Sequence, residues 1–140
     1  MSVLQGSVAA LGNKMPKVLG SKAHAIADYA TVGTFFALAW IFWRRNKRAA
    51  ISALICGGAE LTTTLLTDFP GGVADVISLP THIKIDYGLA AAASSMPSLM
   101  AFDDRPEAKW FRILGLNVTA VAALTDTRSG LRTERRKSAA

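Results

Sequence analysis

A six-residue pattern that occurs twice constrains the architecture of this chain more than any other feature. His24-Ala25-Ile26-Ala27-Asp28-Tyr29 is matched 58 residues later by His82-Ile83-Lys84-Ile85-Asp86-Tyr87. The same offset, without a gap, carries Leu66-Thr67-Asp68 onto Leu124-Thr125-Asp126 and Gly57 onto Gly115. Both ends of a unit of roughly 45 residues are therefore duplicated, which predicts two equivalent structural repeats.

Charged residues occur in short clusters separated by long apolar tracts. They make up 19% of the 140 residues and gather at 44–48, 103–112 and 128–137. The tract from Val32 to Trp43 contains none. A soluble helical bundle would carry charge on the outer face of every turn. The pattern therefore favours helices in lipid, and the alternative is a soluble four-helix bundle.

Four segments approach the roughly 20 residues that cross a bilayer as a helix. They run about 23–43, 49–67, 82–102 and 109–125. The predicted fold is therefore all-α, a four-transmembrane-helix bundle made of two repeats. Each repeat contains two spans, so both run in the same direction, related by an axis along the membrane normal. His24 and His82 are then expected at the same depth.

The predicted boundaries divide the chain into three parts. Residues 1–22 form an N-terminal tail or an interfacial segment, and residues 127–140 form a basic tail. Residues 23–126 form the membrane domain, with repeat 1 at about 23–68 and repeat 2 at about 81–126.

Several single residues predict how the helices end and meet. Thr81 is expected to cap the third helix, Pro97 to kink it or end it early, and Pro106 to open the fourth. Small residues four apart allow membrane helices to approach closely. One such pair occurs in each span: Gly33/Ala37, Ala53/Gly57, Gly88/Ala92 and Gly115/Thr119.

The duplicated histidines and aspartates carry the chemistry that the sequence offers. Residues four apart share a helix face, so Asp28 can accept a hydrogen bond from His24, and Asp86 from His82. The repeat symmetry brings both pairs into one cluster. We consider four roles: a structural clasp between two helices, a zinc, iron or manganese site, axial ligation of haem or a chlorin, and a proton or ion relay.

Glu60 is a second polar residue inside an apolar tract. An ionised carboxylate at such a depth is costly, so it is expected to be paired or protonated. The residue at the equivalent position of the second repeat is Val118, and its neighbour Asn117 is the expected partner. The two readings are a buried hydrogen bond between helices and a small transport or proton path.

The order of these motifs resembles the SPW-repeat family of small bacterial integral membrane proteins. Each two-helix unit of that family has Ser-Pro-Trp near the end of its first helix. Here Met96-Pro97-Ser98 stands at that place in the second repeat and Ala39-Trp40-Ile41 in the first, so the tripeptide is absent from both. The resemblance covers about 23–126 and implies a four-span membrane bundle in the bacterial inner membrane. It implies no activity for any residue.

The leading interpretation is a non-enzymatic integral membrane protein that serves as an accessory or scaffold subunit of a larger membrane complex. Phosphate-binding loops, nucleophile elbows and His-Glu zinc helices are all missing from the sequence. The net charge is +6, but the C-terminal run of basic residues lacks the interleaved aromatics of a nucleic-acid surface. Membrane lipid and other membrane subunits are the expected partners, with no bound cofactor. A slight excess of basic residues on the side of the termini predicts that this side is cytoplasmic.

Overall fold

The computed structural model describes residues 14–128, 135, 136 and 138–140. Within them the chain forms the helices α2 (Ser21–Phe42), α3 (Lys47–Leu65), α4 (Leu79–Leu99) and α5 (Ala108–Leu124). The predicted all-α class and its four helices are confirmed. Most of the predicted N-terminal tail, 1–13, and residues 129–134 and 137 of the basic tail lie outside the described residues.

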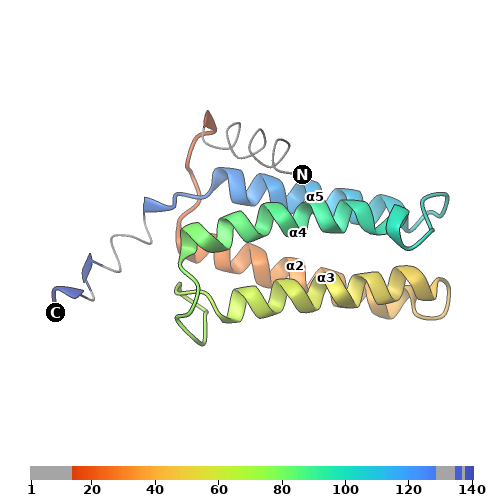
Figure 1. Ribbon diagram of the computed structural model, residues 1–140, viewed down its shortest axis with the longest axis horizontal. Coiled ribbons are helices and arrows are strands. Elements are labelled where there is room, and N and C mark those ends of the chain that lie inside the picture. Colours follow the sequence, from red (N-terminus) through yellow and green to blue (C-terminus); the bar gives the residue numbers. More distant parts are fainter. Residues whose placement is uncertain (1–13, 129–134, 137) are drawn as a thin grey trace.

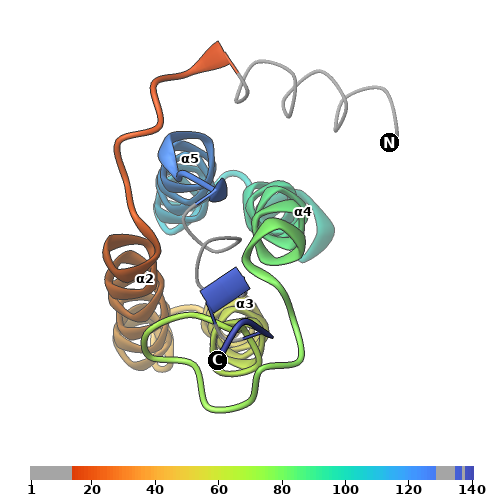
Figure 2. The ribbon, with the colours of Figure 1, turned by 90° about the vertical axis from the view of Figure 1, so that its left-hand side faces the viewer.

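The helices form two antiparallel hairpins that lie side by side. α2 packs chiefly on α3, α4 packs chiefly on α5, and α3 and α4 complete the contact between the hairpins. Figure 1 shows both hairpin loops at one end of the bundle and the link from α3 to α4 at the other. The end-on view in Figure 2 shows the four helices around a common centre. We call the two ends the loop end and the link end.

One helix meets the requirements of a membrane span by length and composition. It is α2, with a mean hydropathy of 1.5 over its best 18-residue window, and 44% of that window is buried. Signal sequences and the core helices of soluble proteins meet the same requirements. In the part of the chain that the structure describes, α3, α4 and α5 do not meet them, so the prediction of four spans is supported at one helix only.

Two of the predicted helix starts are wrong. The residue that caps α4 is Ser78, and Thr81 lies inside the first turn with its hydroxyl 3.0 Å from that of Ser78. Pro106 stands two residues before α5, which begins at Ala108. Pro97 lies in the last turn of α4, and the helix ends at Leu99, three residues before the predicted end. Proline removes a helical hydrogen bond, so this early end was expected.

Two glycines at equivalent positions bring the helices of each hairpin together. A methyl group added at Gly57 would lie 2.9 Å from Phe35 Cβ on α2. One added at Gly115 would lie 2.8 Å from the Ala90 carbonyl oxygen on α4. Gly33 and Gly88 have no neighbour within 4 Å of that position, so only two of the four predicted small pairs make close contacts.

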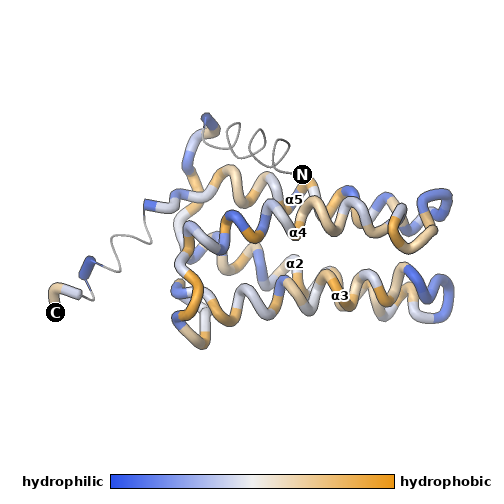
Figure 3. The backbone as a smooth tube through the Cα atoms, viewed as in Figure 1, coloured by the Kyte–Doolittle hydropathy of each residue, from blue (hydrophilic) through white to orange (hydrophobic). Residues whose placement is uncertain are grey.

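The apolar core is concentrated at the loop end. Phe111 lies 5.3 Å from Phe102 and 6.3 Å from Phe35, measured between ring centroids. Small residues of α3, among them Ala49 and Ala53, are fully buried against these rings. Figure 3 shows hydrophilic residues gathered on the two loops beyond this core. The link end is built differently, because its smaller apolar cluster, which includes Phe69, Leu79 and Ile83, lies beside buried polar side chains.

Candidate metal centre

Four buried polar side chains meet at the link end of the bundle. His24 and Asp28 come from the first two turns of α2, and His82 and Asp86 come from the first two turns of α4. Their exposed fractions are 0%, 3%, 0% and 1%, respectively. The spacing of four residues places each histidine above its aspartate on one helix face. The parallel course of α2 and α4 then brings the two pairs to one level.

The four side chains form a closed ring in which each carboxylate contacts both imidazoles. His24 Nε2 lies 3.3 Å from Asp28 Oδ2 and 3.2 Å from Asp86 Oδ2. His82 Nε2 lies 3.1 Å from Asp28 Oδ2 and 3.1 Å from Asp86 Oδ1. Asp86 makes its two contacts with different oxygens. When one ligand atom is taken from each residue, the four atoms all lie within 4.8 Å of one another. We call this set of residues the His–Asp cluster.

Two threonines fix the other nitrogen of each imidazole. Thr125 Oγ1 lies 2.8 Å from His24 Nδ1, and Thr67 Oγ1 lies 2.6 Å from His82 Nδ1. Each hydroxyl donates its single proton to a carbonyl one turn back in its own helix, that of Val121 or Thr63. The hydroxyls must therefore accept from the imidazoles, so both Nδ1 atoms carry a proton. Each Nε2 atom, facing the carboxylates, is the remaining ligand position.

These contacts cross between the repeats. His24 of the first repeat bonds Thr125 of the second, and His82 of the second bonds Thr67 of the first. All four positions obey the offset of 58 residues. The arrangement therefore has an approximate two-fold symmetry, and each half of the chain completes the polar contacts of the other.

Backbone hydrogen bonds hold both threonines in place. Leu19 N donates to Leu124 O at 2.9 Å, and Asp126 N donates back to Leu19 O at 2.8 Å. At the equivalent positions, Ile77 N donates to Leu66 O, and Asp68 N donates to Ile77 O, both at 2.8 Å. These bonds flank Thr125 and Thr67. Main-chain contacts therefore extend the repeat upstream to Leu19 and Ile77, beyond the predicted starts at 23 and 81.

An aromatic ring covers the His–Asp cluster on the side of the link. The Phe69 ring centroid lies 5.5 Å from that of His82 and 6.2 Å from that of His24. Phe69 is itself buried, and the position 58 residues later is Thr127. The cluster is thus shielded from solvent at the link end, which strengthens the electrostatic interactions inside it.

The structure brings together some of the residues singled out from the sequence and separates others. His24, Asp28, His82 and Asp86 share one cluster. Glu60 is 1% exposed, and its Oε1 atom has no hydrogen-bond partner within the described residues. Asn117 is exposed and donates to Thr31 Oγ1 at 3.5 Å, so it does not serve as the expected partner of Glu60.

Sequence reasoning assigned no role to Thr67 and Thr125. Both belong to the duplicated Leu-Thr-Asp triplets, so the repeat itself marked them. Their role depends on a hydrogen bond between His24 and Thr125, which are roughly 100 residues apart in the sequence, so only the structure shows it. No family model, curated protein or solved structure matches the chain. The resemblance to the SPW-repeat family stays a prediction.

Proposed function

We propose that this protein is a non-enzymatic membrane bundle that holds one divalent transition-metal ion, of the zinc type, in the His–Asp cluster. The observation that carries the proposal is the geometry of the four ligand atoms. A tetrahedral ion with bonds of about 2.1 Å separates its ligand atoms by about 3.4 Å. The four N···O contacts of the cluster, two of which use different oxygens of Asp86, are 3.1, 3.1, 3.2 and 3.3 Å long, and one ligand atom from each residue lies within 4.8 Å of the other three.

The hydrogen bonding of the cluster supports the same proposal. His24 Nε2, His82 Nε2, Asp28 Oδ2 and Asp86 Oδ1 are buried and have no hydrogen-bond partner of good geometry among the described residues. The imidazole nitrogens and carboxylate oxygens approach one another to 3.1–3.3 Å, a separation also found between the ligands of a shared ion. Histidines that bind metal usually donate their other ring N–H to a fixed acceptor. Thr125 and Thr67 are such acceptors here.

The charge of the cluster fits a divalent ion. Two neutral imidazoles and two carboxylates carry a charge of about −2, which one divalent cation balances, so the buried unit is neutral. A haem or chlorin fits less well, because both Nε2 atoms, which would bind its metal, already contact the carboxylates of Asp28 and Asp86. Four buried protein ligands are typical of structural rather than catalytic sites.

The polarity of the bundle supports a location in the membrane. Within the predicted spans 23–43, 49–67, 82–102 and 109–125, every Asp, Glu and His is buried, and the exposed charged residues are Lys84, Lys109 and Arg112, close to the starts of α4 and α5. The other exposed positions in these ranges are apolar or uncharged, and Trp40, at 84%, is the most exposed large apolar side chain. Polar inside and apolar outside is the arrangement of membrane bundles. The internal polar residues lower the mean hydropathy of α3 and α4, although they do not face the surroundings.

The short fourth helix is compatible with this location. α5 has 17 residues, a length of about 25 Å, against a hydrocarbon core of about 30 Å. Arg112 is exposed near its start and can extend its charged end toward headgroups.

The test of the metal proposal is the metal content of the full chain, purified in mild detergent from its native membrane. We expect about one zinc-type ion per chain, by mass spectrometry of the elements. His82→Ala should lose the ion, and Ser95→Ala, an exposed position on the same helix, should keep it. If His82→Ala fails to fold, treating the wild type with a chelator should lower its thermal midpoint, and zinc should restore it.

Two results would overturn the proposal. A metal-free wild-type protein that zinc does not stabilise would leave the cluster as a clasp of hydrogen bonds. A Soret or chlorin band in the visible spectrum that is lost with His24→Ala or His82→Ala would replace the ion by a pigment.

An accessory role in a larger membrane complex is the second candidate, and the exposed aromatic side chains at the loop end are its candidate contact surface. Trp40 and Trp43 of the α2 hairpin and Trp110 of α5 are all exposed. Such rings fit a neighbouring protein or the membrane interface equally well. Cross-linking in intact membranes distinguishes the two: a discrete adduct larger than the chain supports a protein partner, and its absence leaves lipid.

A further inference from the structure

A pocket lies at the loop end of the bundle, at the end opposite to the His–Asp cluster. It has a volume of about 480 Å³ and lies between the loop that joins α2 to α3 and the loop that joins α4 to α5. Its lining consists of Arg45, Asn46, Lys47, Arg48, Ala101, Phe102, Asp104 and Arg105. Four of these residues are cationic and one is anionic, so the lining carries a strong positive excess.

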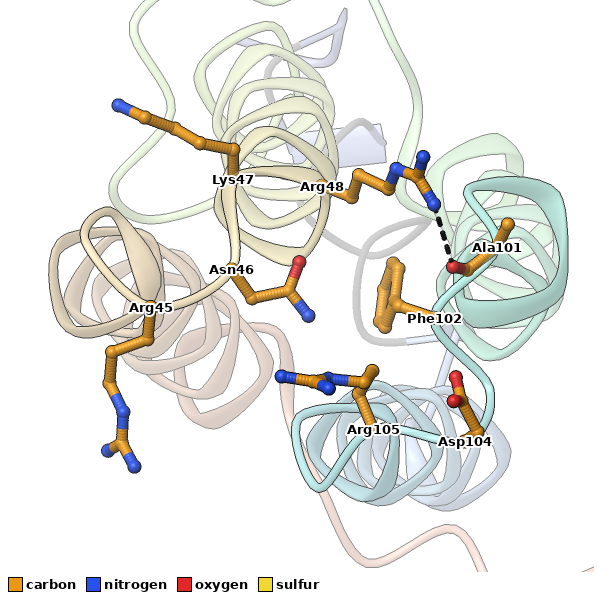
Figure 4. Close-up of a pocket in the computed structure, with 8 residues that line it drawn as sticks. All are labelled: Arg45, Asn46, Lys47, Arg48, Ala101, Phe102, Asp104 and Arg105. Carbon is orange, nitrogen blue, oxygen red and sulfur yellow. Dashed lines mark hydrogen bonds between the residues drawn. The ribbon is translucent and has the colours of Figure 1, made fainter.

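The side chains that reach the opening are hydrogen-bond donors. Figure 4 shows Arg48 and Arg105 on opposite sides of Phe102, with the Asn46 amide beside them. Arg48 donates to the Ala101 carbonyl at 3.1 Å, which holds one edge of its guanidinium in place. The side chain of Arg105 is exposed and makes no hydrogen bond or ion pair with the described residues. A planar guanidinium with unused N–H groups binds phosphate oxygens in pairs.

The charged residues around the pocket favour an anionic ligand. Arg45 and Lys47 extend outward in Figure 4, and the Lys47 ammonium lies 3.5 Å from the centroid of the Trp43 ring. They add positive potential without filling the pocket. Of the nearby acids, Glu107 accepts a hydrogen bond from Asn46 and Asp103 pairs with Arg112, which leaves Asp104 as the acid of the lining. α3 also begins here: its Ala49 amide already donates to Asn46 Oδ1, and the positive end of the helix dipole favours an anion.

We propose that this pocket binds a phosphate group through Arg48, Arg105 and Asn46. The group can belong to a membrane lipid headgroup or to a soluble phosphate. The place of the pocket is suited to a headgroup: the charge-free run of α2 ends at Trp43, next to the loop that lines the pocket. Trp43 and Trp110 lie where interfacial aromatics are found in membrane proteins. This proposal does not depend on the metal site.

The experiment is a calorimetric titration of the full chain in an uncharged detergent. Short-chain phosphatidylglycerol is the lipid probe, sodium phosphate is the soluble probe, and an uncharged monoacylglycerol is the control. Arg48→Gln and Arg105→Gln should each weaken binding about tenfold or more, because each removes a charge-assisted hydrogen bond. Arg44→Gln removes the same charge from the same loop outside the pocket and should change binding by less than about threefold.

The outcomes separate the two sources and the failure of the proposal. Binding of phosphatidylglycerol alone, with the expected loss in both pocket variants, assigns the pocket to a lipid headgroup. Competition by sodium phosphate assigns it to a soluble phosphate. If neither anion binds, the proposal is wrong. It is also wrong if Arg44→Gln loses as much affinity as the pocket variants, because the loop would then attract anions by its overall charge and not through a defined site. Arg105→Gln keeps the test valid if Arg48→Gln unfolds, since the Arg105 side chain supports no other contact.

Discussion

The sequence repeat is preserved at the link end of the bundle and lost at the loop end. At the link end, His24, Asp28 and Thr67 have identical counterparts 58 residues later. At the loop end, the residues Arg44-Arg45-Asn46 correspond to Phe102-Asp103-Asp104, and nothing is shared. The link end is held by polar contacts of 2.6 to 3.3 Å, whereas the loop end is held by packed rings. Polar contacts need particular atoms, but apolar packing needs mainly a matching volume.

The aspartates provide the largest test of this difference. Asp28→Asn and Asp86→Asn should each release the proposed ion and lower the free energy of unfolding by about 3–5 kcal/mol, because a buried charged partner is lost. The two losses should be equal within about 1 kcal/mol, as the symmetry requires. At the loop end, Arg112→Gln breaks the exposed pair with Asp103 and should cost at most about 1 kcal/mol. Denaturation in detergent measures all three. Unequal losses for the two aspartates would break the symmetry of the link end.

Substitution of the glycines tests whether the close helix packing is also the same in the two repeats. Gly57→Ala and Gly115→Ala should each lower the free energy of unfolding by about 1–3 kcal/mol, because the added methyl group has no room. Gly33→Ala and Gly88→Ala are the matched controls. They add the same methyl group to helices at positions with no neighbour, so they should be neutral or stabilise by up to about 1 kcal/mol. Comparable effects in all four variants would mean that the glycines act through helix propensity alone.

The threonines should affect the metal more than the fold. Thr67→Val and Thr125→Val keep the size of the side chain and remove the acceptor for one imidazole N–H. Loss of such an outer partner typically weakens metal affinity about 10–100-fold. Competition with a chromogenic zinc chelator measures this, and Thr34→Val, on an exposed face of α2, is the control. Unchanged affinity in both variants would assign the threonines a purely structural role.

Glu60 should give the smallest effect, because it has no counterpart in the second repeat. Its Oε1 atom has no partner among the described residues, so Glu60→Gln should leave metal content unchanged and shift the free energy of unfolding by less than about 1 kcal/mol. A large loss of stability would reveal a partner for this carboxylate. A loss of ion or proton flux in vesicles, with normal assembly, would instead revive the transport path considered from the sequence.

The helices were predictable because their signals are local and duplicated. The predicted second span, 49–67, lies within two residues of α3 at both ends, Lys47–Leu65. The pairing of His24 with Asp28 follows from helix geometry, and the meeting of the two pairs follows from the repeat. Helix periodicity predicts contacts between neighbouring turns of one helix but no hydrogen bond between distant segments. The bond between His24 and Thr125 was therefore missed.

The assignment of Asn117 to Glu60 failed for a geometric reason. Successive residues on a helix point about 100° apart. Val118 is the counterpart of Glu60 and is buried, so the neighbouring Asn117 is turned toward the outside of the bundle. The predicted start of α5 also failed for a local reason. Pro106 lies in a separate turn, in which Ala108 N donates to Arg105 O, and the helix begins only at Ala108.

The crossed bonds between histidines and threonines have a consequence for how such a molecule can be assembled. Residue i of one repeat meets residue j of the other, and residue j meets residue i, which is the contact pattern of a symmetric dimer. A single two-helix unit bearing one His-x3-Asp and one Leu-Thr-Asp cannot complete its own ring, but two copies of it can. The 140-residue chain is, in this respect, a homodimer joined end to end. The segment 69–78 between α3 and α4 connects the two subunits and also supplies Phe69 and Ile77 to the surroundings of the ring, whereas the two loop ends are free to differ.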